Sequence, residues 1–118
     1  MKLSIIIVNY RAWRFITRAL DKLAPDFPDE WEIIIVDNES ESAAFIEHRD
    51  RYPWVRMVAN PANSGFGYGC IIGVAESSGE QLLFMNPDVV ASVEDIRSLI
   101  AEKSAHPDVG IVTPRQVG

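Results

Sequence analysis

The sequence has few of the residues that build disulfides, zinc centres or histidine-based catalysis. It contains one cysteine, Cys70, and two histidines, His48 and His106. A single thiol cannot form an internal disulfide, and neither histidine stands at metal-ligand spacing from the other or from Cys70. No Ser/His/Asp set suggests a catalytic triad. We therefore expect a protein of a reducing compartment, with both histidines at its surface.

Positive charge and long apolar runs are also scarce. The 118 residues carry 11 Lys and Arg against 17 Asp and Glu, a formal net charge of -6. This balance argues against nucleic acid or an anionic membrane as a bulk partner, but it allows one anionic ligand in a local pocket. The longest apolar runs, such as 3–8, are too short to span a bilayer, and no signal peptide opens the chain. We expect no transmembrane segment and a cytoplasmic location.

What the sequence does contain is a regular alternation of strand and helix patterns. "LSIIIV" (3–8) and "WEIIIV" (31–36) are near-continuous β-branched runs, typical of parallel strands covered on both faces. The pattern predicts further strands at 55–59, 81–85 and 109–113, and helices at about 13–23, 42–49 and 67–76 and from Ser92. Ser92 with Asp95 resembles a capping box. The expected fold is one α/β domain over 1–118, a doubly wound, mainly parallel sheet with helices on both faces.

Polar residues stand where three of the predicted strands end. Ligands of doubly wound sheets bind beyond the carboxyl ends of the strands, so these side chains should converge on one edge. The sequence does not give the strand order that would make them neighbours. The residues are Asn9, Tyr10, Asp37, Asn38, Asn86, Pro87 and Asp88.

Asp37 and Asp88 are the two carboxylates of this set, and each has two interpretations. Asp37 could accept hydrogen bonds from the base or ribose of a ligand, or cap the turn that follows its strand. Asp88 could hold Mg²⁺ or Mn²⁺, which need only one or two carboxylates when phosphates and water fill the other positions. Pro87 stiffens this turn and pushes Asn86 toward extended geometry. The alternative is a Pro-Asp turn without a ligand.

The segment "NPANSGFGYGCIIG" (60–73) is rich in glycine. Glycines let the backbone approach a ligand closely, and a helix N-terminus favours anionic groups. The spacing matches neither the dinucleotide fingerprint G-x-G-x-x-G nor a P-loop, so those two cofactor interpretations fail. A tight loop before a closely packed helix explains the glycines equally well.

Five motifs in this order, "SIIIVNYR", "IIIVDNES", "NPANSGFGYG", "LLFMNPDV" and "AHPDVGIVTPR", resemble the nucleotide-sugar-binding half of family 2 glycosyltransferases of the GT-A fold. The match is closest to the bacterial rhamnosyltransferase-like branch. The resemblance implies that Asp88 holds Mg²⁺ or Mn²⁺ on the donor's phosphates, with Asn86 alongside. The other residues that it assigns to the nucleotide pocket are Asn9 and Tyr10 after the first strand, Asp37 and Asn38 at the base, and Asn63, Gly65, Phe66 and Gly67 in a loop over 63–69.

The function that the resemblance implies is inverting transfer of a sugar from a UDP- or dTDP-sugar to a glycan or lipid-linked acceptor, as in polysaccharide biosynthesis. Uracil and thymine present the same hydrogen-bonding edge, so both donors stay open. Cys70 and Ile71 depart from the branch, which usually has two asparagines there.

Family members normally continue into an acceptor-binding half that supplies the Asp or Glu general base. We therefore expect a piece of a longer enzyme or a truncated gene product, one that binds nucleotide without catalysing transfer by itself. An uncovered apolar face would allow a homodimer, and the full-length protein could sit at the inner face of the membrane. A receiver-like domain with Asp37 as phosphoacceptor is a remote alternative, because the acidic pair after the first strand and the lysine after the last are missing.

Overall fold

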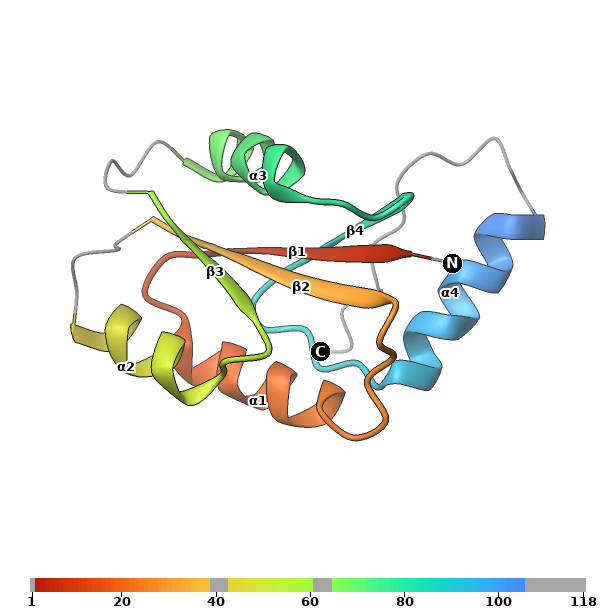
Figure 1. The fold of residues 1–118 in the computed structure, drawn as a ribbon, viewed down its shortest axis with the longest axis horizontal. Helices are drawn as coiled ribbons and strands as arrows, with labels where there is room; N and C mark the ends of the chain where they lie inside the picture. Colours follow the sequence, from red (N-terminus) through yellow and green to blue (C-terminus); the bar gives the residue numbers. More distant parts are fainter. Residues whose placement is uncertain (1, 39–42, 61–64, 106–118) are drawn as a thin grey trace.

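The computed structural model describes residues 2–38, 43–60 and 65–105, and within these ranges strands and helices alternate as expected (Figure 1). The predicted strand at 109–113 lies outside the described residues. The predicted strand at 81–85 is confirmed at both ends, whereas the first two strands each extend one residue further, to a polar side chain. The elements are β1 (Leu3–Asn9), α1 (Trp13–Leu23), β2 (Trp31–Asp37), α2 (Ala43–Arg51), β3 (Arg56–Ala59), α3 (Gly65–Glu76), β4 (Gln81–Met85) and α4 (Val93–Ala105).

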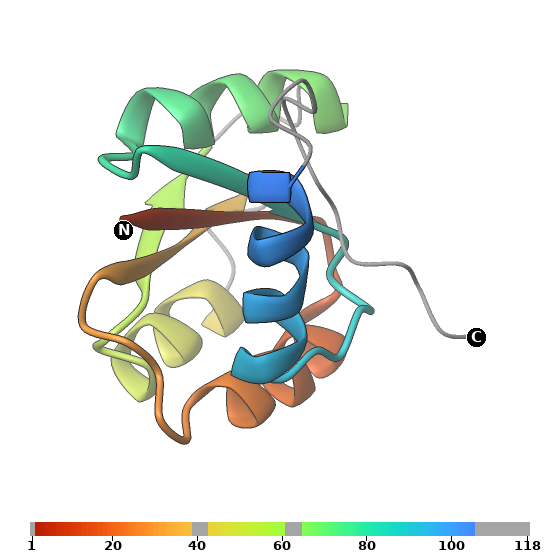
Figure 2. The same cartoon turned by 90° about the vertical axis from the view of Figure 1, so that its right-hand side faces the viewer.

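The four strands form one parallel sheet in the order β3-β2-β1-β4. Figures 1 and 2 show α3 on one face of this sheet and α1 with α2 on the other. The predicted fold class is therefore confirmed: the protein is an α/β domain with a parallel sheet covered on both faces. Among the described residues no helix is both long and apolar enough to cross a membrane.

The main core lies between the sheet and helices α1, α2 and α4. Alternate residues of the strands point into it, because side chains along a strand alternate between the two faces. Fully burying one such aliphatic side chain stabilises the fold by about 1.5–3 kcal/mol. This packing fixes the positions of the strands relative to one another. The contributing side chains include Leu3, Ile5, Ile7, Ile33, Ile35, Leu83 and Met85 from the sheet, Ile16, Leu20 and Leu23 from α1, and Ile96 from α4.

Helix α3 packs on the opposite face through two glycines. A Cβ on Gly69 would lie 2.7 Å from Cγ1 of Val8, and one on Gly73 would overlap Cγ2 of Ile6, so only glycine allows this close approach. The helix predicted over 67–76 is confirmed at its end and begins two residues earlier, at Gly65, so residues 65–69 of the loop that the resemblance implies over 63–69 are helical. Glycine's low helix propensity suggests a loop, but packing on β1 offsets that cost.

Helix α4 begins with the predicted capping box. The backbone N–H of Asp95 donates to Oγ of Ser92 at 3.1 Å, and the backbone N–H of Ser92 donates to Oδ2 of Asp95 at 2.9 Å. Each of the two side chains thereby satisfies one backbone N–H group that would otherwise be free at the start of the helix. The backbone hydrogen bond from Ser92 lowers the pKa of the Asp95 carboxyl.

At the amino end of the sheet, the Glu32 carboxylate ties three segments together. Its Oε2 accepts hydrogen bonds from Oγ of Ser4 at 2.6 Å, from the backbone N–H of Ser78 at 2.7 Å and from Oγ of Ser78 at 2.9 Å. The Ser4 hydroxyl oxygen in turn accepts from the backbone N–H of Gly79 at 2.8 Å. The turn between α3 and β4 is thereby fastened to β1 and β2.

Candidate functional site

The strand order creates a switch point at β1. The chain proceeds outward from β1 to β2 and β3, and then returns to place β4 on the other side of β1. Loops leave such a point in opposite directions, and the gap beyond the carboxyl ends is where open α/β sheets bind ligands. Asn9 stands in register with Asp37, and Ile7 with Met85, so the loops after β1, β2 and β4 start at nearly the same level. These ends lie at the left of Figure 1.

Asn9 and Asp37 form a buried polar pair at this edge. Both side chains are fully buried, and Nδ2 of Asn9 donates to Oδ1 of Asp37 at 3.0 Å. The other end of the Asn9 amide accepts from the backbone N–H of Ala12 at 2.9 Å, so the side chain is held at both ends. A carboxylate costs free energy to bury unless it is hydrogen-bonded, and Asn9 supplies one such bond. The structure brings together two residues that the sequence could not show to be neighbours.

Asn38 and Asn60 form a second buried pair beside the first. Nδ2 of Asn60 donates to Oδ1 of Asn38 at 2.8 Å, and both residues are 5% exposed. The backbone N–H of Asn60 also donates to the carbonyl of Asp37 at 2.9 Å. The sequence analysis did not single out Asn60, although Asn60 directly follows β3, much as Asn9 is the last residue of β1 and Asp37 the last of β2. The same rule, polar residues at strand ends, would have found it.

Tyr10 and Arg11 form the exposed tip of the loop after β1. Tyr10 is 47% exposed, and Cζ of Arg11 lies 5.1 Å from the centre of its ring. Arg11 has a φ of 56°, in the left-handed region that residues with a Cβ rarely occupy. Tyr10 therefore stands at the predicted edge with its ring covered on one side by a cation.

Residues 86–89 form a tight turn directly after β4. The backbone N–H of Val89 donates to the carbonyl of Asn86 at 3.1 Å, which leaves Pro87 and Asp88 as the central residues. Proline suits the first of these positions because its φ is already fixed. Val89 is buried and anchors the turn, whereas Asn86 and Asp88 are exposed. Asp88 thus lies exposed in a stiff turn directly after β4, the strand beside β1 at the switch point.

This arrangement fits a hard divalent cation with few protein ligands. Within residues 2–38, 43–60 and 65–105, no three His, Cys, Asp or Glu side chains gather as a metal cluster. Mg²⁺ and Mn²⁺ are commonly held by one or two carboxylates, with substrate phosphates and water completing the shell. Asp88 with the neighbouring Asn86 can therefore hold such an ion only together with a ligand that brings its own oxygens.

The remaining predicted residues lie at the start of α3. Gly65, Phe66 and Gly67 are in its first turn, and Asn63 lies outside the described residues. Gly67 is exposed, and a Cβ there would meet nothing within 4 Å. Cys70 is half-buried, and burial raises the pKa of its thiol, which makes it a poor nucleophile at neutral pH.

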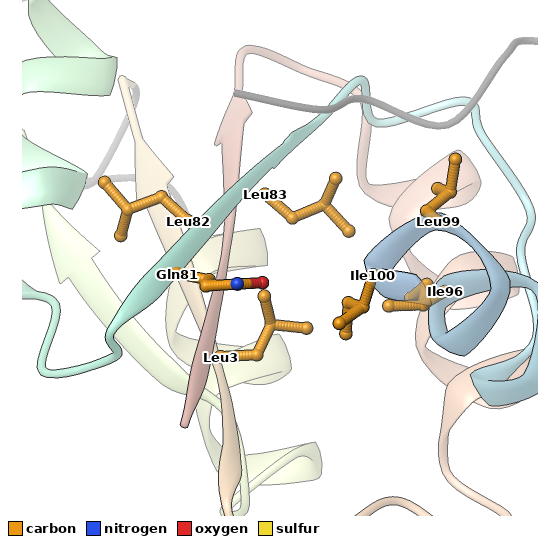
Figure 3. A pocket seen from close by; sticks show the side chains of 7 residues that line it. All are labelled: Leu3, Gln81, Leu82, Leu83, Ile96, Leu99 and Ile100. Atoms are coloured by element: carbon orange, nitrogen blue, oxygen red, sulfur yellow. The ribbon is translucent and has the colours of Figure 1, made fainter. Parts of the chain in front are cut away.

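A small apolar hollow lies away from this edge, between β4 and α4. Its volume is about 10 Å³, roughly the minimum that one water molecule needs. Figure 3 shows its side chains, which are aliphatic apart from the Gln81 amide. Without a charged group it offers nothing to hold a phosphate, and we regard it as a gap in the packing of α4. Its lining residues are Leu3, Gln81, Leu82, Leu83, Ile96, Leu99 and Ile100.

Comparison with known proteins identifies the class. The family model of glycosyl transferase family 2 matches residues 4–118, and the chain belongs to this family. Among curated proteins it is 26% identical over 110 residues to an uncharacterized glycosyltransferase of Haemophilus influenzae, covering 93% of this chain and 37% of that protein. It is 29% identical over 119 residues to the low-salt glycan biosynthesis hexosyltransferase Agl10 of Haloferax volcanii, covering 96% and 36%. The chain thus spans about a third of these relatives.

Solved structures give the same result for the fold. Residues 1–349 of S. aureus TarS, in complex with UDP-GlcNAc, superpose with a TM-score of 0.76 at 27% identity, covering 91% of this chain and 32% of that one. The mannosyltransferase PcManGT of Pyrobaculum calidifontis, in complex with GDP-Man and Mn²⁺, gives 0.75 at 19% identity, covering 92% and 33%. The second likeness concerns the fold alone. The rhamnosyltransferase-like branch stays a prediction.

Proposed function

We propose that this chain is the donor-binding part of a glycosyltransferase that uses a UDP- or dTDP-sugar. The observation that carries this proposal is the buried Asn9–Asp37 pair at the switch point, with a stiffly held Asp88 carboxylate following the neighbouring strand. A nucleoside at the β1–β2 side and phosphates toward Asp88 would use both features at once. The parent enzyme transfers the sugar with inversion to a glycan or lipid-linked acceptor, at the cytoplasmic side of the membrane.

Each polar group has a role in this proposal. The Asp37 carboxylate accepts the N–H of a uracil or thymine ring. Because Oδ1 of Asn38 accepts from Asn60, the Asn38 amide nitrogen is the end that can donate to a carbonyl of the base. Asn9 holds Asp37 in place, and the exposed Tyr10 ring borders the pocket. Gly65 and Gly67 would let the α3 backbone pass close to the nucleotide.

Asp88, with Asn86 alongside, would hold Mg²⁺ or Mn²⁺. When bound, such an ion neutralises charge that develops on the departing nucleoside diphosphate. Asp88 would contribute one anionic oxygen ligand from a turn that Pro87 keeps rigid.

The relatives support the proposed donor and acceptor. TarS, 27% identical over most of this chain, was crystallised with UDP-GlcNAc, which favours a UDP-sugar here. The name of Agl10 gives it a role in glycan biosynthesis, which favours a glycan acceptor. A second candidate function is nucleotide binding without transfer, because every described residue to which we assign a role helps to bind the donor or its metal ion.

The test is calorimetric titration of the chain with UDP and dTDP, with and without Mn²⁺. We expect Mn²⁺ to strengthen binding in the natural chain and to have no effect in Asp88→Ala. Asp29→Ala is the matched control, since Asp29 is an exposed carboxylate just before β2, at the opposite end of the sheet. Binding of neither nucleotide, or equal Mn²⁺ dependence in Asp88→Ala, would contradict the proposal. Release of UDP from a UDP-sugar in the presence of an acceptor then separates transfer from binding alone.

A further inference from the structure

Arg11 has a backbone conformation that costs free energy for most residues and less for glycine or asparagine. Its φ of 56° lies in the left-handed region, which costs a residue with a Cβ roughly 1–2 kcal/mol. Glycine adopts this conformation without that cost, and among residues with a Cβ asparagine adopts it more often than arginine. Strain of this kind concentrates at functional sites.

The position of Arg11 is set by the neighbouring strands. Ile7 is in register with Met85, so Arg11 leaves the sheet four residues beyond this pair and Asp88 leaves it three residues beyond. The two loops start from adjacent parallel strands at the same edge. Arg11 also follows Asn9 by two residues, and Asn9 contacts Asp37. The guanidinium thus belongs to the loop that lies between the proposed base site and the proposed metal site.

The ring of Tyr10 supports the guanidinium. Cζ of Arg11 lies 5.1 Å from the ring centre, within the range of a cation–π contact. Stacking engages the flat face of a guanidinium, whereas phosphate recognition uses its N–H edge, so both contacts can be made together. An exposed, aromatic-supported arginine is pre-organised for a planar, bidentate contact with phosphate.

The charges around the switch point make a cation useful there. The chain carries a net charge of -6, and the two carboxylates at this edge, Asp37 and Asp88, would both repel a diphosphate. A divalent ion at Asp88 offsets only part of that repulsion. Helix α1 adds a small positive contribution, because it begins beside Arg11 with Ala12 at its N-cap and no acidic residue in its first turn.

We propose that Arg11 binds the diphosphate of the nucleotide-sugar donor through its guanidinium, from the loop next to the one that carries Asp88. This inference rests on the proposed function. It divides the ligand between two sets of residues: Asp37 and Asn38 hold the nucleoside, whereas Arg11 contacts only the phosphates. The affinity for UDP therefore depends on Arg11, and the affinity for uridine does not.

The experiment compares UDP, UMP and uridine by calorimetric titration in the presence of Mg²⁺. We expect Arg11→Gln to weaken UDP binding about tenfold, the effect of losing a charge-assisted hydrogen bond, and to leave uridine binding within about twofold. Arg14→Gln is the matched control, because Arg14 is also an exposed arginine stacked on an adjacent aromatic residue, with its Cζ 4.7 Å from the ring centre of Phe15. This control should bind all three ligands as the natural chain does.

A second pair of variants separates phosphate binding from backbone strain. Arg11→Gly removes both the guanidinium and the left-handed strain, and Asp26→Gly relieves the same strain at a φ of 58° in the loop between α1 and β2. Both variants should melt at a higher temperature than the natural chain. Only Arg11→Gly should lose affinity for UDP.

Two results would overturn the assignment of Arg11. Unchanged UDP affinity in Arg11→Gln would remove the phosphate contact, and equal losses for UDP and uridine would show that the loop, rather than the charge, matters. If the natural chain binds neither UDP nor uridine, the proposed function itself fails and the role of Arg11 fails with it. Uridine binding that persists in Arg11→Gln while UDP binding falls supports both.

Discussion

The two ends of the sheet use polar side chains in different ways. At the amino end the Glu32 carboxylate accepts three hydrogen bonds, all from Ser4 and Ser78, and these bonds join β1, β2 and the turn before β4. At the carboxyl end the buried side chains pair with one another across strand ends, Asn9 with Asp37 and Asn38 with Asn60. Beside those pairs stand exposed residues on loops.

This difference separates a hydrogen-bond network that stabilises the fold from a candidate ligand-binding site. A carboxylate surrounded by serine donors stabilises the fold and has little left to offer a ligand. At the carboxyl end, exposed Tyr10 and Asp88 lie on the loops that follow β1 and β4 and diverge from the switch point. Changes at the amino end should therefore alter the free energy of unfolding, and changes at the carboxyl end should alter nucleotide affinity.

The largest expected effect comes from breaking the amino end with Gly79→Ala. A Cβ there would lie 2.6 Å from the backbone nitrogen of Ser4 and 2.8 Å from the carbonyl carbon of Leu3, so backbone must move. We expect the free energy of unfolding to fall by roughly 3 kcal/mol, measured by urea denaturation. Gly67→Ala is the control, because its Cβ meets nothing within 4 Å and should change the stability by less than about 1 kcal/mol. Equal losses in both would contradict the close packing at Gly79.

Glu32→Gln should lower the free energy of unfolding by a smaller amount, roughly 1–2 kcal/mol at pH 7, since a neutral amide accepts weaker hydrogen bonds than a carboxylate. Burial by itself raises the pKa of Glu32, but hydrogen bonds from Ser4 and Ser78 and the Arg56 charge outweigh it and bring the pKa below its usual range. A lowered carboxyl pKa stabilises the fold above the unfolded value of about 4.3. This stabilisation is lost as the pH falls through the lower folded pKa.

The pH dependence distinguishes charge from shape at Glu32. Urea titrations from pH 7 down to about pH 3 should show the natural chain and Glu32→Gln converging as the carboxylate is protonated. UDP affinity at pH 7 should be the same for both. A stability difference that stays constant with pH, or a loss of UDP affinity in the variant, would argue against the division between the two ends.

The smallest effect concerns Ser92, which caps α4 and belongs to neither polar network. Ser92→Ala removes the hydroxyl that accepts from the backbone N–H of Asp95 and should cost about 1 kcal/mol by thermal denaturation. Thr17→Ala is the control, because the Thr17 hydroxyl donates to the Arg14 carbonyl within α1 and satisfies no free N–H. If both substitutions cost the same, the cap contributes no more than an ordinary hydroxyl.

Local patterns predicted much of the fold. The β-branched runs gave β1 and β2 to within one residue at their carboxyl ends, because strands covered on both faces are apolar throughout. The spacing of Ser92 and Asp95 gave the start of α4, because capping depends on residues three apart. The polar residues that close strands were identified for the same reason, since they interrupt an apolar run.

What the sequence did not predict depends on contacts between distant segments. The position of β4 beside β1 follows from the path of the chain, and no local pattern encodes it. The start of α3 at Gly65, two residues before the predicted one, depends on packing of the helix against Val8 and Ile6, which overrides glycine's low helix propensity. The pairing of Asn60 with Asn38 could not be predicted, because the two residues lie 22 positions apart and meet only through the sheet.

The most direct test of the division between the two ends is a nuclear magnetic resonance titration of the ¹⁵N-labelled chain with UDP and Mg²⁺. We predict saturable shifts of the backbone amides of Asn9, Asp37, Asn38, Asn60 and Asp88 at the carboxyl end. The amides of Glu32, Ser78 and Gly79 at the amino end should keep their positions. Shifts confined to the amino end, or no saturable shifts at all, would contradict a nucleotide site at the switch point.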